Sequence, residues 1–322
     1  MTIAPGLSGR ALIKGHAAGT DLLLLIDPEQ EVAVTAADVV AVCDRRAGLG
    51  ADGLVRVVRI NALSGAEAFR AAVPEAEWFL DYYLADGTPA VGPHLPFGDA
   101  CRMLAAVLDS EGLVPLDDGA AITIGTRGGA RTVTRLGGQW AVDAGPAHPA
   151  AVADPAAVPD DEGWDTVVRI PGLDGERAAL SLDLCGRHVV VALGEEAELD
   201  AAGAGATAAG GQVDYDPEPD AAPSLELVVP MGERTDPGTG DRVGLARVRV
   251  LTSGAGPAGG AEAYCAAAAA LHEWTGEGAL TDYLLEIPGG EVGVHVGAAP
   301  LVDDAMAVLT GPVDLVGRIT LV

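Results

Sequence analysis

Short apolar runs, interrupted by turn-forming residues, dominate the pattern along this chain. Runs of about four to eight apolar residues between glycine, proline or aspartate are typical of buried β-strands. Such runs occupy residues 22–26, 54–60, 121–124, 167–170, 188–193, 225–229 and 245–251. The pattern therefore predicts a protein with many strands.

Two segments have the pattern of long buried helices, at residues 99–108 and 262–274, and a shorter amphipathic helix is predicted at 36–46. A glycine-bearing turn precedes each long helix, and both helices are rich in small residues. Many strands with two central helices indicate an α+β fold built from two similar halves. A length of 322 residues also favours two domains over a single core.

The segment 197–211 and its continuation 214–223 are rich in alanine, glycine, aspartate and proline. This composition is typical of a mobile surface excursion, so no regular element is predicted there. A similar stretch at 147–162 is expected to link or decorate the domains.

Charge excludes several classes of partner. The chain has 47 Asp and Glu residues against 19 Lys and Arg, which gives a formal net charge of -28, and Lys14 is its only lysine. Such a surface repels phosphate backbones and anionic lipid, so neither a nucleic-acid nor a membrane role is expected. No apolar run approaches the ~20 residues of a membrane span, and no signal pattern is present, so a cytoplasmic location is expected.

The four cysteines give no sign of a metal site. Cys43, Cys101, Cys185 and Cys265 lie far apart and form neither a CxxC pair nor a cluster with metal-ligand spacing. We therefore expect reduced thiols and no bound metal.

One segment carries a specific resemblance. Residues 42–54 read VCDRRAGLGADGL, which is similar to the signature of diaminopimelate epimerase: cysteine-aspartate-arginine followed by glycine-x-glycine-alanine-aspartate-glycine. Upstream, Lys14 and Asp21 resemble the family's first strand and its substrate loop. Downstream, the segment 78–87 resembles the one that leads to the family's first active-site turn. The resemblance extends over about nine-tenths of the chain and is strongest before residue 87.

This resemblance implies a fold and a division of the chain. The family has two pseudo-symmetric halves, each a curled, mostly antiparallel sheet around a central helix, with the active site between them. We expect an N-terminal half at residues 1–116 with a closing strand at 312–322, and a C-terminal half at 117–311. In the family, a cysteine at the head of each central helix moves a proton on one face of the α-carbon.

Both of these cysteines are missing here. When the first active-site turn is aligned on Arg102, Phe97 takes the position of the family's first catalytic cysteine. In the second turn, Ala261 takes the position of the second catalytic cysteine. A phenyl ring and a methyl group cannot carry a proton, so we do not expect amino-acid epimerase activity.

The groups that anchor a zwitterionic substrate have also changed. Thr20 stands where the family has an asparagine, and Ser253 lies where it has a glutamate-arginine pair. Gly186 replaces an asparagine beside the retained His188. The site is therefore expected to take a larger and less charged small molecule, against a surface formed by Thr20, Phe97, Ser253, Ala261 and Tyr264.

Acidic residues have entered both helix heads. Asp99 and Glu262 fall at or next to the first helical positions, where a carboxylate stabilises the helix terminus and would repel a carboxylate ligand. We expect Asp99, Glu262 and His188 to supply the acid, base or hydrogen-bonding groups. A relocated pair of thiols, Cys101 and Cys265, is the alternative, one helical turn deeper in the core.

These observations favour a cofactor-free isomerase or cyclase of specialised metabolism. The sequence around Phe97 also resembles a turn of the phenazine-biosynthesis isomerases, in which carboxylates replace thiols. The rival hypothesis is a non-catalytic pseudoenzyme that binds a ligand or a protein partner, and assembly as a homodimer is left open.

Overall fold

The computed structural model of the chain describes residues 3–65, 67–91, 97–150, 163–207, 212–252 and 259–322. It divides into two compact units, each described here by itself. Unit 1 comprises Met1–Asp143, Gly254–Gly260 and Thr310–Val322, and unit 2 comprises Ala144–Ser253 and Ala261–Leu309.

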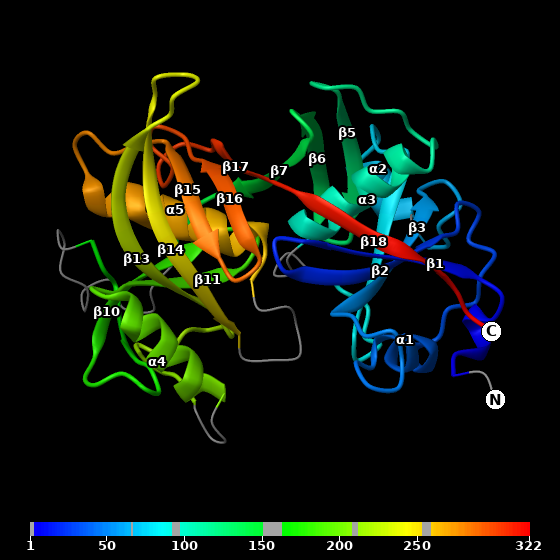
Figure 1. Cartoon of the computed structure of the whole chain (residues 1–322), viewed down its shortest axis with the longest axis horizontal. Helices are drawn as coiled ribbons and strands as arrows, with labels where there is room; N and C mark the ends of the chain where they lie inside the picture. The colour runs from blue at the N-terminus through cyan, green and yellow to red at the C-terminus, as the bar shows by residue number, and fades with distance from the viewer. Residues whose placement is uncertain (1–2, 66, 92–96, 151–162, 208–211, 253–258) are drawn as a thin grey trace. The chain divides into compact units, whose positions relative to one another are not determined.

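Unit 1 is a mostly antiparallel sheet (Figure 1). Its neighbouring strands run in the order β18, β1, β2, β3, β4, β5, β6, β7, and only the β2–β3 and β4–β5 pairs are parallel. The strands are β1 (Ala11–Ala17), β2 (Thr20–Ile26), β3 (Gly53–Arg59), β4 (Trp78–Leu84), β5 (Ala121–Thr126), β6 (Gly129–Leu136), β7 (Gln139–Pro146) and β18 (Val313–Thr320).

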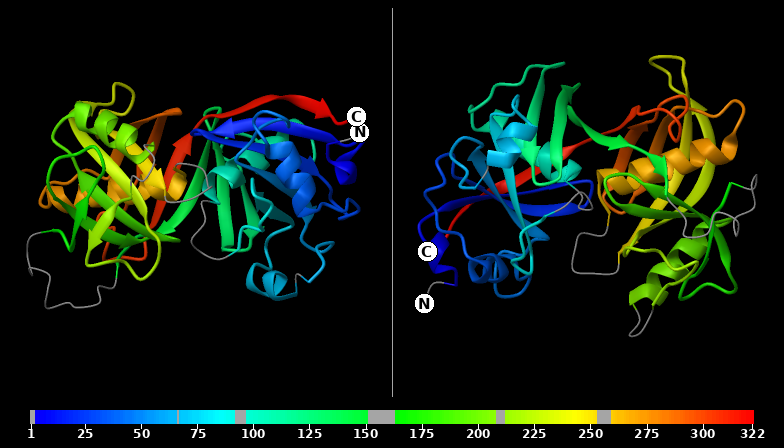
Figure 2. Two further views of the ribbon diagram at one scale, coloured as in Figure 1. Left: turned by 90° about the horizontal axis from the view of Figure 1, so that it is seen from below. Right: turned by 180° about the vertical axis from the view of Figure 1, so that it is seen from behind.

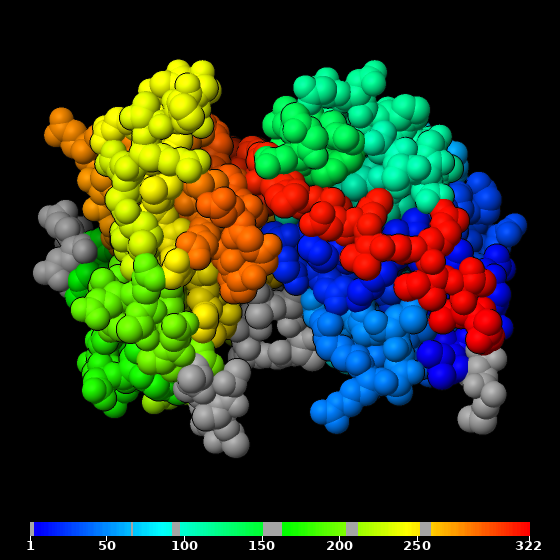
Figure 3. Space-filling model, viewed as in Figure 1, coloured from blue at the N-terminus to red at the C-terminus, as the bar shows by residue number. Residues whose placement is uncertain are grey.

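Helix α3 (Gly98–Ser110) is the central helix of unit 1. It contacts β1, β2, β4, β6 and β18, and all its residues from Gly98 to Leu108 are buried. The smaller elements η1 (Pro5–Leu7), α1 (Ala36–Cys43) and α2 (Glu67–Ala72) complete the unit. Figure 2 shows α3 from two further sides, and Figure 3 shows the closing strand β18 (red) on the surface of unit 1.

Unit 2 repeats the arrangement around helix α5 (Ala261–Thr275), which contacts β11, β13, β14 and β16. In its main sheet the neighbouring strands run in the order β10, β11, β13, β14, β15, β16. The short β9 pairs with β10, and β12 pairs with β9. The strands are β8 (His148–Pro149), β9 (Thr166–Arg169), β10 (Arg177–Asp183), β11 (Arg187–Ala192), β12 (Asp214–Asp216), β13 (Ser224–Thr235), β14 (Arg242–Thr252), β15 (Asp282–Ile287), β16 (Gly290–His295) and β17 (Met306–Gly311).

The two units share one connectivity, which confirms the predicted pair of similar halves. From β1 to β6 the successive pairs are antiparallel, parallel, antiparallel, parallel, antiparallel, and the same alternation runs from β10 to β16. Each parallel pair needs a crossover. Helices α1 and α3 provide the crossovers in unit 1, and α4 (Glu196–Thr207) and α5 provide them in unit 2. The α+β prediction is confirmed.

Two details depart from the predicted layout. The expectation that residues 197–211 lack regular structure is wrong, because α4 occupies most of that tract, while residues 208–211 lie outside the described part. Leu199 and Ala202, three residues apart on one helical face, pack against Val189, Val191 and Leu225, so tertiary burial overrides the composition.

The described unit 1 also contains β5 and β6, which the predicted boundary after residue 116 assigned to the second half. None of the helices described is both long and apolar enough to cross a membrane.

Candidate functional site

The head of α3 places Phe97, Asp99 and Thr20 close together in unit 1. Phe97 precedes the first helical residue, and its side chain is fully buried. Asp99 is the second residue of the helix and Thr20 is the first residue of β2; both are buried. The Thr20 Oγ1 hydroxyl donates a hydrogen bond to Oδ2 of Asp99, at 3.1 Å.

The other oxygen of Asp99 faces a cation of its own helix. Arg102 Nη2 donates to Asp99 Oδ1 at 2.5 Å, and neither side chain is exposed. Arg102 Nη1 also donates to the carbonyl of Pro312, at 3.4 Å. Both carboxylate oxygens of Asp99 are therefore committed to internal partners, and the pair is neutral as a whole.

Residues of the signature segment form an ion-pair network with Asp21, the residue that follows Thr20. Arg45 contacts Asp21 at 2.9 Å and Asp52 at 2.6 Å, and Lys14 forms an ion pair with Asp21. Asp52 Oδ2 also accepts the backbone N–H of Asp21, at 2.9 Å. Burial raises the pKa of the neighbouring Cys43 thiol to about 12, so this signature cysteine is a protonated core residue.

Two signature glycines are required by close backbone approach. A Cβ on Gly53 would collide with the carbonyl oxygen of Tyr83 and the ring of Tyr82, and a Cβ on Gly48 would collide with carbonyl oxygens of α1. The signature therefore maintains the packing of β3 and α1 in this chain.

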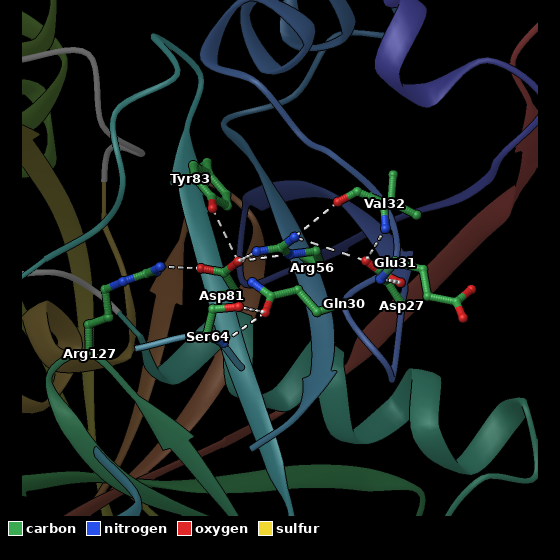
Figure 4. Close-up of polar contacts among 9 residues, drawn as sticks. All are labelled: Asp27, Gln30, Glu31, Val32, Arg56, Ser64, Asp81, Tyr83 and Arg127. Carbon is green, nitrogen blue, oxygen red and sulfur yellow. Dashed lines mark hydrogen bonds and ion pairs between the residues drawn. The ribbon is translucent and has the colours of Figure 1, made fainter. Parts of the chain in front are cut away.

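A second polar cluster of unit 1 lies around Asp81, on β4 (Figure 4). Its fully buried carboxylate accepts from Arg56 Nε at 2.9 Å, from the Tyr83 hydroxyl at 3.1 Å, and from Arg127. Arg56 also lies 4.0 Å from Asp27. Because both oxygens of Asp81 bind guanidinium groups of this cluster, its geometry ties strands together and leaves no oxygen for a ligand.

In unit 2, the head of α5 carries Ala261, Glu262 and Tyr264, all of which are buried. Glu262 is the second residue of its helix, as Asp99 is in α3. Ser253 lies outside the described residues. Cys101 and Cys265 are completely buried within their helices; the relocated thiol pair stays untested.

His188 lies near the start of β11 and faces Glu226 on the adjacent strand β13. The His188 Nδ1 and the Glu226 Oε1 are 2.9 Å apart, and His188 Nε2 lies 3.1 Å from the carbonyl oxygen of Leu184. Glu226 is completely buried and His188 is 5% exposed. Side chains alternate along a strand, and the neighbours Val189 and Leu225 belong to the core under α4. His188 and Glu226 therefore point to the opposite face, where α5 packs against these strands.

The contacts of His188 fix its tautomer. A carbonyl oxygen can only accept, so Nε2 must carry a hydrogen, and the second proton is shared between Nδ1 and Glu226 Oε1. Burial lowers the pKa of His188, but Glu226, the Leu184 carbonyl and the nearby Glu262 raise it by more in total. Burial raises the pKa of Glu226, and His188 and Ser224 offset only part of that increase.

Sequence reasoning predicted roles for His188 and Glu262 but missed Glu226. The sequence did contain a sign of its role, because Glu226 is the single acidic residue inside the apolar run 225–229. A buried strand rarely contains a carboxylate without a partner. The structure thus groups His188, Glu226 and Glu262 in unit 2, and Thr20, Phe97 and Asp99 in unit 1. Among the described residues, no group of three or more acidic, histidine or cysteine side chains is arranged to hold a metal ion.

Solved structures establish the fold of the whole chain. A phenazine biosynthesis protein of the PhzF family from Bacillus anthracis aligns with a TM-score of 0.60, at 12% identity, over 97% of this chain and 99% of that chain. A probable proline racemase from Agrobacterium radiobacter aligns with a TM-score of 0.53, at 11% identity, over 97% and 93%. At these identities the likeness concerns the fold alone, and it confirms the predicted epimerase-like architecture.

Sequence relatives establish the family, although no protein-family model matches the chain. The diaminopimelate epimerase of Thermobifida fusca is 45% identical over 135 residues, which are 41% of this chain and 47% of the relative, so that match spans about half of the relative's length. The diaminopimelate epimerase of Mycobacterium avium is 31% identical over 317 residues, which are 95% of this chain and 94% of the relative. The chain therefore belongs to the diaminopimelate epimerase family.

Proposed function

We propose that this member of the family is no longer an amino-acid epimerase and instead catalyses a cofactor-free isomerisation or cyclisation of a larger, less charged small molecule. One observation carries the proposal. Phe97 and Ala261 stand at the two helix heads, where the resemblance places the catalytic thiols, and both side chains are completely buried.

Inversion of an α-carbon requires a proton carrier on each face of the substrate. At the head of α3, Phe97 carries no proton, and the carboxylate of Asp99 is paired with Arg102 and Thr20. At the head of α5, by contrast, Glu262 lies near the buried His188–Glu226 pair. Acid–base chemistry at one helix head suits a proton shift within one molecule better than inversion at one carbon.

The decisive test is proton exchange in deuterated water. Purified protein incubated with diaminopimelate, or with other free amino acids, should incorporate no deuterium at the α-carbon above the rate without protein. Incorporation above that rate would contradict the proposal directly. A panel of neutral compounds with an acidic C–H next to a carbonyl should then be searched for isomers of unchanged mass.

A non-catalytic binding protein is the second candidate, and the burial of Asp99, Glu262 and His188 favours it. A binder would raise the melting temperature with a ligand but would leave that ligand chemically unchanged after prolonged incubation. A catalyst would convert it.

A further inference from the structure

The two carboxylate oxygens of Glu226 have different surroundings. One oxygen, Oε1, is engaged by His188 at 2.9 Å, whereas the other, Oε2, is buried and forms no hydrogen bond with any described group. Ser224 lies near enough to lower the pKa of the carboxyl, yet it does not make a hydrogen bond of good geometry to Oε2. A buried polar atom without a partner destabilises the folded state, so such an atom in a native protein needs an explanation, and a functional role is one.

His188 itself has no nitrogen available for a ligand. Nδ1 faces Glu226 and Nε2 faces the Leu184 carbonyl, so contact with a substrate would require one of these hydrogen bonds to break. The sequence-based prediction gave His188 an acid/base role of its own. The contacts instead run from the Leu184 carbonyl through His188 to Oε1 of Glu226, and they leave the buried Oε2 without a hydrogen bond.

We propose that Glu226 is the acid/base group of the isomerisation put forward above, acting through Oε2, with His188 as its positioning residue. This inference rests on the proposed function. His188 holds the carboxylate in one orientation, and its Nε2–H bond to Leu184 keeps the imidazole from rotating. Glu262, in the first turn of α5, adds a second carboxylate whose charge acts on His188.

The proton transfer balances without any other reactant. Oε2 accepts a proton from a substrate carbon, and the electron pair of the broken C–H bond stays on the substrate, delocalised into an adjacent unsaturated group. Oε2–H then returns the proton to a different carbon, and that carbon supplies the electron pair of the new bond. Because one oxygen performs both steps, part of the isotope at the first carbon should reappear at the second.

A probe can test the oxygen before any substrate is known. A small neutral diazoacetamide esterifies only protonated carboxyl groups: the carboxyl proton moves to the diazo carbon, the carboxylate oxygen then bonds to that carbon, and dinitrogen leaves. Exposed carboxylates are ionised at pH 7 and react little. We expect mass spectrometry of the folded wild-type protein to locate an ester at Glu226.

Variants of the pair sharpen the result. Glu226→Gln should remove this ester. His188→Gln removes the cation that lowers the carboxyl pKa, so at pH 7 it should increase labelling at Glu226 by about 10-fold or more. A side chain with only a structural role would show neither the ester nor this dependence on His188.

Internal controls decide what a negative result means. Burial also raises the pKa of Asp143 and Asp165, so either should react if the probe is competent and reaches it. Esters at these residues, with none at Glu226 in wild type and in His188→Gln, would overturn the inference. If Glu226→Gln fails to fold, the site of labelling in wild type still decides. The proposed function fails separately, through deuterium uptake by diaminopimelate, so the two results are distinguishable.

Discussion

Replacing Asp99 by asparagine should destabilise unit 1 severely, although asparagine has nearly the same shape. Asp99 does not cap α3: Phe97 is the N-cap residue, and no side chain caps the helix there. What the substitution removes is the only carboxylate within hydrogen-bond distance of Arg102 among the described residues, at 2.5 Å, with both side chains at 0% exposure. The guanidinium would stay buried without its counter-charge.

The magnitude follows from that burial. Breaking a buried ion pair by removing one partner costs about 3–5 kcal/mol. Loss of a first-turn carboxylate from the helix N-terminus adds roughly 0.3–1 kcal/mol. Domains are stable by only about 5–15 kcal/mol, so Asp99→Asn should remove a large fraction of the unfolding free energy. Urea unfolding, followed by far-ultraviolet circular dichroism, measures it.

A matched control lies on the same helix. Asp109 pairs with Arg135 at 2.7 Å, but these side chains are 28% and 29% exposed. Solvent screens such a pair, so Asp109→Asn should cost about 1 kcal/mol or less. The double variant Asp99→Asn with Arg102→Met should be more stable than Asp99→Asn alone, because it no longer buries an unpaired charge. The reasoning fails if Asp99→Asn and Asp109→Asn prove equally mild.

Three further predictions follow from the packing and the pKa shifts. Leu199→Ala should cost about 2–5 kcal/mol by urea unfolding if α4 is part of the core, whereas a cost below about 0.5 kcal/mol would contradict its packing. Cys101→Ala and Cys265→Ala should each cost about 1 kcal/mol and leave any turnover intact; loss of turnover without loss of stability would support the relocated thiols. The folded pKa of His188 is raised above the ordinary 6.5, so its stabilisation is present below that pH and declines as pH rises through the folded value. Unfolding free energies at pH 6 and pH 9 should therefore differ more in wild type than in the double variant His188→Gln with Glu226→Gln, which lacks both groups of the pair.

The strands were the part of the fold that local sequence could predict. The runs at 22–26 and 245–251 lie within β2 and β14, because a buried strand between turns leaves a short apolar signature. Helix α4 was hidden because alanine and glycine dominate it. Among residues 196–203 of this helix, Leu199 and Ala202 are the buried ones, and their partners lie on strands of the sheet.

Residues of the site could be predicted from the sequence only where a single position of a motif identified them. Phe97 and Ala261 were recognisable because they replace specific residues of a motif. The pairing of His188 with Glu226 was not, since the two are 38 residues apart and meet only through the parallel pairing of β11 with β13. The ion pair of Asp99 with Arg102 was visible in the i,i+3 spacing, but its complete burial was not.

The buried carboxylates Asp99 in unit 1 and Glu226 in unit 2 have different cationic partners, and this difference bears on function. Asp99 pairs with an arginine of its own helix, and guanidinium groups do not give up a proton in proteins. In unit 2 the cation is an imidazole, which shares its proton with Glu226. An arginine suits a permanent structural pair, whereas a histidine keeps a proton available for transfer. If this protein is a catalyst, the physical chemistry of the two pairs places its proton transfer in unit 2 and leaves a packing role to the head of α3.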